Sequence, residues 1–306
     1  MAKTNWTLII IGILSLLFIS IILIGVVAVF SGNPKSDSSG NIALIPIKGI
    51  ITTGEDALSF EESATSSDII ELIEKADNDQ GIVGLIFEID SPGGSPVASD
   101  EIAIAIKNVK KPKVAWIREV GASGAYWIAT STDYIVANKM SITGSIGVIA
   151  SYLDFSEFIQ RYNVSYERLV GGNYKDIGSP LKDPTEEERQ ILQGKIDKLH
   201  NYFVEEVSRN RKLQKSRVEK IATGLFYLGS EALELGLVDE IGGKKEAITY
   251  IEKKEGITAQ VIEYKKEKTL LDVLGKFLNE KSFYVGQGIG AAMFRLRGFS
   301  SLRINI

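Results

Sequence analysis

The stretch GIVGLIFEIDSPGGSP, residues 81–96, runs from an apolar segment into a glycine-rich loop. Its first ten residues are a β-rich and mainly apolar run, which is typical of a buried strand. The preceding residues 66–79 have helical apolar spacing, and residues 41–51 are a further strand candidate. This order of strand, helix and strand indicates parallel α/β layering, with functional loops at the carboxyl ends of the strands.

The same alternation continues towards the C-terminus. Apolar spacing predicts helices over residues 96–110, 154–162 and 185–210, and β-rich runs predict strands over residues 113–117 and 134–137. We therefore expect a mainly parallel α/β body.

The composition is that of a folded protein. Of its 306 residues, 44% are apolar and 24% charged, and the net charge of −4 gives no general affinity for nucleic acid. The chain has no cysteine, which excludes thiol catalysis, disulfides and cysteine-ligated metal sites. We expect no cofactor, no metal and no nucleic-acid partner.

The N-terminus carries an uncharged apolar segment over residues 6–30. As a helix it would be roughly 37 Å long, enough to cross a hydrocarbon core of about 30 Å. A cleaved signal peptide, the alternative, has an apolar core of only about 7 to 15 residues. We predict a single-pass membrane anchor behind a cytoplasmic stub (residues 1–5), followed by a linker over residues 31–40. Lys3 precedes the anchor, and positively charged residues next to a membrane span tend to stay in the cytoplasm. The chain that follows the anchor is therefore expected to cross the membrane.

Two glycine-rich loops follow predicted strands, DSPGGSP at residues 90–96 and EVGASGAYW at residues 119–127. Successive glycines can direct backbone N–H groups into a cleft, where each donor stabilises a developing oxyanion by about 3 kcal/mol. The first loop could instead be a tight turn before a helix, with no role in binding an oxyanion. The second loop surrounds Ser123 with small residues, which suits either close backbone packing or a nucleophile that an extended substrate must reach.

A serine nucleophile needs a general base. The single histidine, His200, lies at the edge of the apolar stripe of the helix predicted over residues 185–210, which is more typical of a surface histidine. The remaining candidate base is a lysine with a lowered pKa. Lys175, in GGNYKDIG, lies in a charge-poor stretch, although a solvated loop lysine fits the same pattern. A lysine base predicts an alkaline activity optimum, above about pH 8.

Six short motifs occur in one order: DSPGG, GASGAYWIA, TGSIGV, GGNYKDIGSP, PTEEER and GLVDEIGG. Together they resemble the SppA family of membrane-anchored signal peptide peptidases over about residues 42–243. The resemblance implies that Ser123 is the nucleophile, Lys175 the general base and Ser145 the residue that orients the lysine. It further implies an oxyanion hole at Gly93 and Gly124, and a substrate groove at Gly94, Ala122 and Tyr126.

The resemblance also carries expectations about fold and activity. It implies a ClpP/crotonase-like α/β spiral of β-β-α units behind one transmembrane helix, with a peptidase domain over residues 41–262. The expected substrates are remnant signal peptides or similar apolar peptides, cut beside small or aliphatic residues through an acyl-enzyme. Family members form homo-oligomeric rings, in which the lysine can face the serine of a neighbouring subunit. The expected location is the cell membrane, with the peptidase domain outside the cytoplasm.

Other functions remain open on the sequence. They are a protease that cuts the hydrophobic segment of a membrane protein such as a stomatin, an inactive membrane-anchored scaffold, and a crotonase-type acyl-CoA enzyme. One departure from the family is visible at residues 224–229, GLFYLG, where the family usually has an arginine after the first glycine. This departure bears on assembly or local packing more than on the chemistry.

The C-terminal segment, residues 263–306, is expected to hold a helix and a basic apolar tail. Residues 281–306 contain no acidic residue, and two arginines, Arg295 and Arg297, interrupt the apolar run. This interruption weighs against a second membrane span. A disordered end, a segment resting on the membrane and a substrate mimic are the three alternatives.

Overall fold

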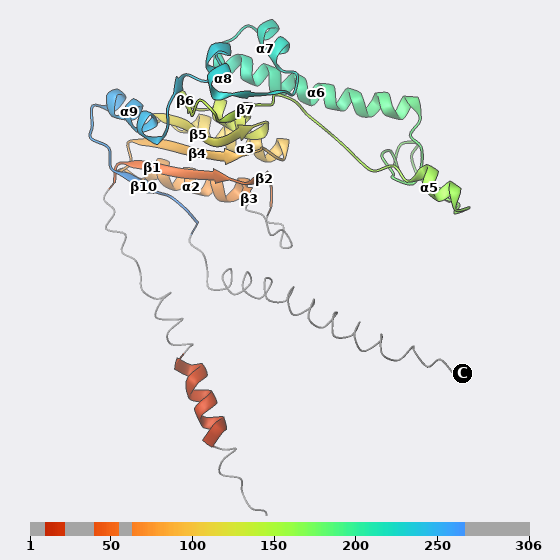
Figure 1. Ribbon diagram of the computed structural model, residues 1–306, viewed down its shortest axis with the longest axis horizontal. Coiled ribbons are helices and arrows are strands. Elements are labelled where there is room, and N and C mark those ends of the chain that lie inside the picture. The colour runs from red at the N-terminus through yellow and green to blue at the C-terminus, as the bar shows by residue number, and fades with distance from the viewer. Residues whose placement is uncertain (1–9, 22–39, 55–62, 267–306) are drawn as a thin grey trace, which may run out of the picture. The chain divides into compact units, whose positions relative to one another are not determined.

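The computed structural model describes residues 10–21, 40–54 and 63–266 (Figure 1). Residues 10–21 form a helix inside the predicted anchor, whose remaining residues lie outside the described ranges, as do nearly all of the predicted linker and most of the C-terminal segment. Within the described ranges, no helix is both long and apolar enough to span a membrane. The chain divides into two units, and the unit of residues 38–265 carries the α/β body.

A central parallel sheet organises this body (Figure 1). Its strand order is β10-β1-β4-β5-β6-β9, and every neighbouring pair in that order is parallel. The strands are β1 (Ile42–Lys48), β4 (Gly84–Ser91), β5 (Lys113–Ala122), β6 (Tyr134–Ala137), β9 (Glu240–Ile241) and β10 (Val261–Glu263). The predicted parallel α/β layering is therefore confirmed.

Short strands extend the sheet near the carboxyl end of β5. β7 (Ile142–Gly144) pairs in parallel with the end of β5, and β8 (Phe226–Leu228) pairs with β7 in the antiparallel sense. A separate two-stranded sheet contains β2 (Ile50–Thr52) and β3 (Ser63–Thr65). Pairing with β7 carries β5 five residues beyond the predicted end at Ile117.

Helices cover both faces of the sheet. The larger apolar core includes residues of α2 (Ser66–Asn78), α3 (Pro96–Asn108) and α4 (Gly124–Thr130), whereas α9 (Lys244–Glu255) packs on the opposite face. Two further helices, α7 (Lys215–Ile221) and α8 (Gly229–Leu235), follow the long helix α6. Because β5 leads directly into α4, the first turn of α4 lies at the carboxyl edge of the sheet.

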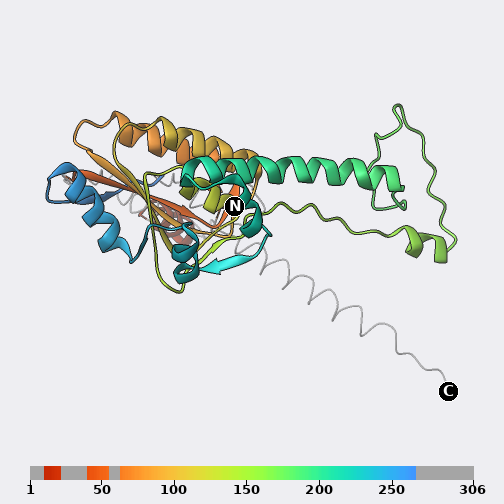
Figure 2. The ribbon, with the colours of Figure 1, turned by 90° about the horizontal axis from the view of Figure 1, so that it is seen from above.

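The long helix α6 (Glu186–Arg211) joins the apolar core at its C-terminal end. Phe203, Val204 and Val207 join the core, whereas the N-terminal half is largely exposed. A helix of this length spans about 39 Å. The preceding segment of residues 150–185, which we call the arm, contains α5 (Ser156–Arg161). Figures 1 and 2 show α5 near the end of α6 that lies away from the sheet.

Candidate active site

Ser123 lies at the sharp turn between β5 and α4. Its backbone has φ +53° and ψ −124°, a region that residues other than glycine rarely occupy. Two hydrogen bonds hold the turn: the Ser123 N–H donates to the Gly144 carbonyl (2.9 Å), and the Trp127 N–H donates to the Ser123 carbonyl (3.0 Å). Strain of this kind gathers at functional sites, and a strand-to-helix turn of this shape can present a nucleophile.

The two glycine-rich loops meet at Ser123. Gly93 has φ +100°, and a Cβ atom on it would lie 2.9 Å from the Ser123 Cβ. The Gly93 N–H donates to Ser91 Oγ (3.1 Å). Among the described residues, no acceptor bonds the amide of Gly94 or Gly124, and a Cβ atom on Gly124 would be 3.4 Å from the Gly94 nitrogen. These two free amides are therefore candidate donors to an oxyanion formed near Ser123.

Ser123 lines two cavities. The first, of about 410 Å³, lies between α3, α4, α6 and residues 147–149. The second, of about 530 Å³, contains Ser123, Ser145 and His200 among its lining residues. An extended ligand that reaches the Ser123 hydroxyl can therefore contact both cavities.

The second cavity brings Ser145 and His200 near the nucleophile. Ser145 has φ +49°, and its hydroxyl donates to the Gly224 carbonyl (3.3 Å). His200 Nε2 lies 2.9 Å from the Ala222 carbonyl. The sequence indicated a partly exposed surface histidine, and the structure shows a half-buried side chain that also lines the cavity. Since a carbonyl accepts only from a protonated nitrogen, His200 Nε2 donates this bond and is not free to act as a base.

Lys175 does not lie in either cavity that contains Ser123. It is an exposed residue of the arm, next to Tyr174, whose hydroxyl contacts the Glu187 carboxylate (2.5 Å). The structure therefore does not bring the predicted nucleophile and the predicted base together within one chain.

An ion-pair cluster fixes this part of the arm. Asp176 Oδ2 lies 2.5 Å from Arg168 Nε, and Asp176 Oδ1 lies 3.2 Å from Lys182 Nζ, which also contacts Glu188 (2.6 Å). The hydrogen bond from Arg168 lowers the pKa of Asp176, and the one from Lys182 lowers the pKa of Glu188. Lys175 thus belongs to a folded segment that holds it outside the two cavities that Ser123 of the same chain lines.

The groove position predicted for Tyr126 is wrong. Its side chain is fully buried, and its hydroxyl donates to the Leu237 carbonyl (2.8 Å). Ala122 is also buried, where it pairs with Gly144. Trp127 lines the first cavity instead, and its position three residues after Gly124 on a helix was a signal that the sequence offered.

The chain is similar to several known proteases. A protein of Enterococcus faecium, provisionally named signal peptide peptidase SppA, is 34% identical over 76% of this chain and 69% of its own length. Protease 4 of Haemophilus influenzae is 36% identical over 69% of this chain and 34% of its own length. A solved membrane-bound stomatin-specific protease with a bound substrate peptide aligns with a TM-score of 0.49 and 18% identity, over 79% of this chain and 98% of that one. Residues 105–258 match peptidase family S49, and the chain belongs to this family.

Proposed function

We propose that the protein is a membrane-anchored serine endopeptidase that uses Ser123 as nucleophile and Lys175 as general base. The observation that carries the proposal is the strained Ser123 beside the free amides of Gly94 and Gly124. A purely structural turn needs neither backbone strain at a serine nor two free N–H donors beside it. Both features are expected in an enzyme that transfers an acyl group to the serine.

The reaction divides into two acyl-transfer steps. The unprotonated amine of Lys175 takes the Ser123 hydroxyl proton as Oγ attacks the scissile carbonyl. The Gly94 and Gly124 amides donate to the oxyanion, in place of the Gly93 amide, which already bonds to Ser91. The lysine then returns the proton to the leaving amine, and water hydrolyses the ester by the same route. Ser145 orients the lysine.

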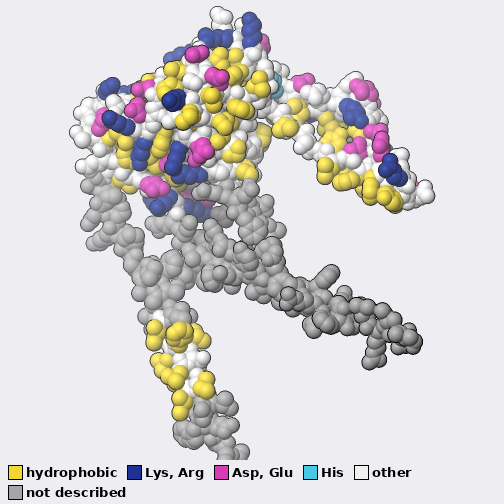
Figure 3. Space-filling model, in the orientation of Figure 1, with side chains coloured by type: hydrophobic (Ala, Val, Ile, Leu, Met, Phe, Trp, Pro, Cys, Tyr) yellow, Lys and Arg dark blue, Asp and Glu magenta, His cyan; other side chains and the backbone are white. Residues whose placement is uncertain are grey.

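The lysine comes from a second copy of the chain. The arm keeps Lys175 out of its own chain's cavities, and it carries many large apolar side chains that are exposed in a single chain (Figure 3). They include Leu153, Phe155, Phe158, Tyr162, Val164 and Leu169. Exposed apolar surface of this extent marks an interaction site. A closed homo-oligomeric ring covers the arm of every copy and completes every site.

The remaining assignments rest on the sequence. Residues 6–30 anchor the protein in the cell membrane with the peptidase domain outside the cytoplasm, and the body adopts the ClpP/crotonase-like spiral. The substrates are remnant signal peptides or similar apolar peptides, which the name of the Enterococcus faecium relative supports.

A serine-directed fluorophosphonate probe tests the proposal on the full-length protein in detergent. We expect labelling of the wild type, loss of labelling in Ser123→Ala, and unchanged labelling in the control Ser230→Ala, which alters an exposed serine of α8. Hydrolysis of a synthetic signal peptide should follow the same pattern. Undiminished labelling of Ser123→Ala would overturn the assignment of the nucleophile.

A further inference from the structure

The first cavity opens at the nucleophile. Ser123 and Gly124 line one end, and the cavity extends between α3 and α6. In the proposed peptidase reaction the scissile carbonyl carbon lies at Ser123 Oγ, with its oxygen towards Gly124. The side chain on the acyl side of the scissile bond is therefore the one placed to enter this cavity.

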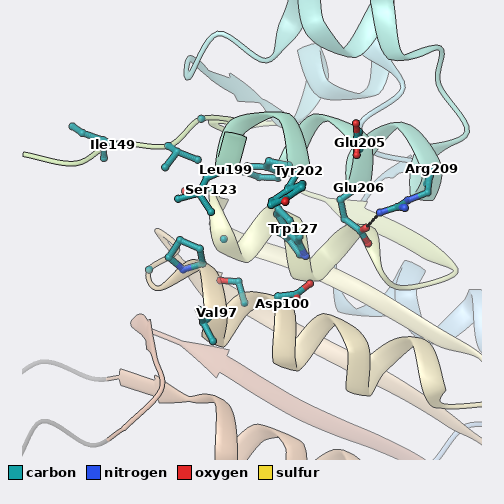
Figure 4. A pocket seen from close by; sticks show the side chains of 17 residues that line it. Val97, Asp100, Ser123, Trp127, Ile149, Leu199, Tyr202, Glu205, Glu206 and Arg209 are labelled. Carbon is teal, nitrogen blue, oxygen red and sulfur yellow. Dashed lines mark hydrogen bonds and ion pairs between the residues drawn. The ribbon is translucent and has the colours of Figure 1, made fainter. Parts of the chain in front are cut away.

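The cavity changes character along its length. Figure 4 shows Ser123, then Trp127 and Asp100, and then Glu206 and Arg209, in this order across the view. In the same view (Figure 4), the apolar side chains of the lining lie on the side of the serine rather than beside Glu206 and Arg209: Val97, Trp127, Ile149, Leu199 and Tyr202. A side chain that fills the cavity therefore needs a long apolar stem before it meets the charged groups.

Most of the charged groups in the lining already have partners. The Glu206 carboxylate accepts hydrogen bonds from Lys107, from Arg209 (2.7 Å) and from Asn210 (2.8 Å). Glu205 Oε1 lies 2.9 Å from Lys215 Nζ. These two carboxylates leave little capacity for a ligand.

Asp100 is different. Within the part of the chain that the structure describes, no hydrogen bond or ion pair reaches its carboxylate. Burial raises its pKa, the negative charges of Glu206 and Glu101 raise it further, and Lys107 opposes them. Asp100 is an exposed residue of the cavity lining, and its carboxylate is available to pair with a cation that enters the cavity.

We propose that this cavity selects a substrate side chain with an apolar stem and a positively charged end, Lys or Arg, whose charge pairs with Asp100. The selection rests on the proposed peptidase function and concerns the residue on the acyl side of the scissile bond. Lys and Arg pack their methylene stems on apolar walls while the charged end reaches a polar group. The aromatic ring of Trp127, which also lines the cavity, can attract a cation as well. The cavity therefore extends the substrate range beyond the small and aliphatic residues that the family resemblance implies.

Three peptides that differ only in this residue test the selection on the full-length protein in detergent. They carry Lys, the uncharged norleucine, whose stem has the same length, or Glu. We expect kcat/KM for the Lys peptide to exceed that for norleucine by roughly tenfold or more, with the Glu peptide slowest. In Asp100→Asn the ratio of Lys to norleucine should fall to about one, while norleucine turnover is kept.

Glu101→Gln is the matched control. Glu101 is the adjacent acid on α3, it accepts a hydrogen bond from Ser66 (2.5 Å), and it does not line the cavity. This variant should keep the preference for Lys. If wild-type enzyme cleaves the norleucine peptide as fast as the Lys peptide, or if Asp100→Asn keeps the Lys preference, the inference is overturned and the peptidase proposal stands. If no peptide is cleaved and Ser123 takes no fluorophosphonate, the proposed function itself has failed.

Discussion

Gly93 lies so close to Gly124 that a Cβ atom on Gly93 would be 2.7 Å from the Gly124 nitrogen. The same atom would approach the Ala122 carbonyl to 2.9 Å, and the φ of +100° is unfavourable for any other residue. Gly93→Ala should therefore displace the loop that holds the oxyanion donors and lower kcat/KM by roughly 100-fold or more. Steady-state hydrolysis of a fluorogenic peptide measures this loss.

Gly194→Ala is the control for this change. Gly194 lies inside α6, and apart from the local helix backbone no atom of the described residues lies within 4 Å of a Cβ placed on it. The variant should keep its activity and gain up to about 1 kcal/mol of stability, because alanine is the better helix former. Unchanged activity in Gly93→Ala would show that the packing of the two loops does not matter for the reaction.

Tyr126 is expected to contribute to the stability of the fold and not to substrate binding. Tyr126→Phe removes a buried hydrogen bond to the Leu237 carbonyl and should lower the free energy of unfolding by about 1 kcal/mol. Denaturant unfolding measures the change. Since the ring lies in the core, kcat/KM should stay within about twofold of wild type. A large loss of activity in a stable Tyr126→Phe protein would return this residue to the substrate groove.

The choice between the two candidate bases is testable by substitution. Lys175→Ala should lower kcat by roughly 100-fold or more, because it removes general-base catalysis. His200→Ala should leave kcat within a few-fold, because Nε2 already donates to the Ala222 carbonyl. Single-turnover hydrolysis separates the two results. If His200→Ala lost as much activity as Lys175→Ala without unfolding, a histidine mechanism would replace the lysine one.

Acid should loosen the arm. The pKa values of Asp176 and Glu188 are lowered in the folded chain by their bonds to Arg168 and Lys182. A carboxylate whose pKa is lowered by folding stabilises the folded arm fully at any pH above its ordinary pKa, which is 3.8 for Asp and 4.5 for Glu. This stabilisation is lost as the pH falls through the pKa of the folded state. The arm should thus keep its order down to about pH 4.5 and lose it progressively below.

Fluorescence anisotropy can follow this transition. Because the chain lacks cysteine, Ser165→Cys gives one site for a dye on the exposed surface of the arm. Asp176→Asn should lower the anisotropy already at neutral pH, whereas Asp183→Asn, which alters an exposed ion pair with Arg189, should not. A flat profile from pH 7 to pH 3 would contradict the role of the cluster.

The sequence predicted the local elements well, because their signals are local. The helix predicted over residues 66–79 is α2, and the strand predicted over residues 134–137 coincides with β6. The predicted end of β5 at Ile117 was wrong because its continuation depends on pairing with β7, which lies about 20 residues later in the chain. Pairing between distant segments leaves no trace in apolar periodicity.

The same limit applies to the candidate site. The glycines around Ser123 signalled close packing, and Gly93 and Gly124 do converge on it. The spacing of three residues between Gly124 and Trp127 predicts a shared helix face, but Tyr126 was assigned to the groove instead, although Trp127 lines the cavity. Nothing in residues 171–178 shows that Lys175 lies on an arm, because that position follows from the length of α6 and from the packing of its C-terminal end alone into the apolar core.

The division of the Ser123–Lys175 pair between two copies is tested most directly by mixing two inactive variants. Ser123→Ala and Lys175→Ala chains with different affinity tags are co-expressed at full length, and complexes that carry both tags are purified in detergent. Random assortment completes about a quarter of the sites, each with Ser123 from one variant and Lys175 from the other. We therefore predict peptidase activity near a quarter of wild type in the mixed complexes and none in either variant alone. Mixed complexes that form but remain inactive would contradict a site shared between copies.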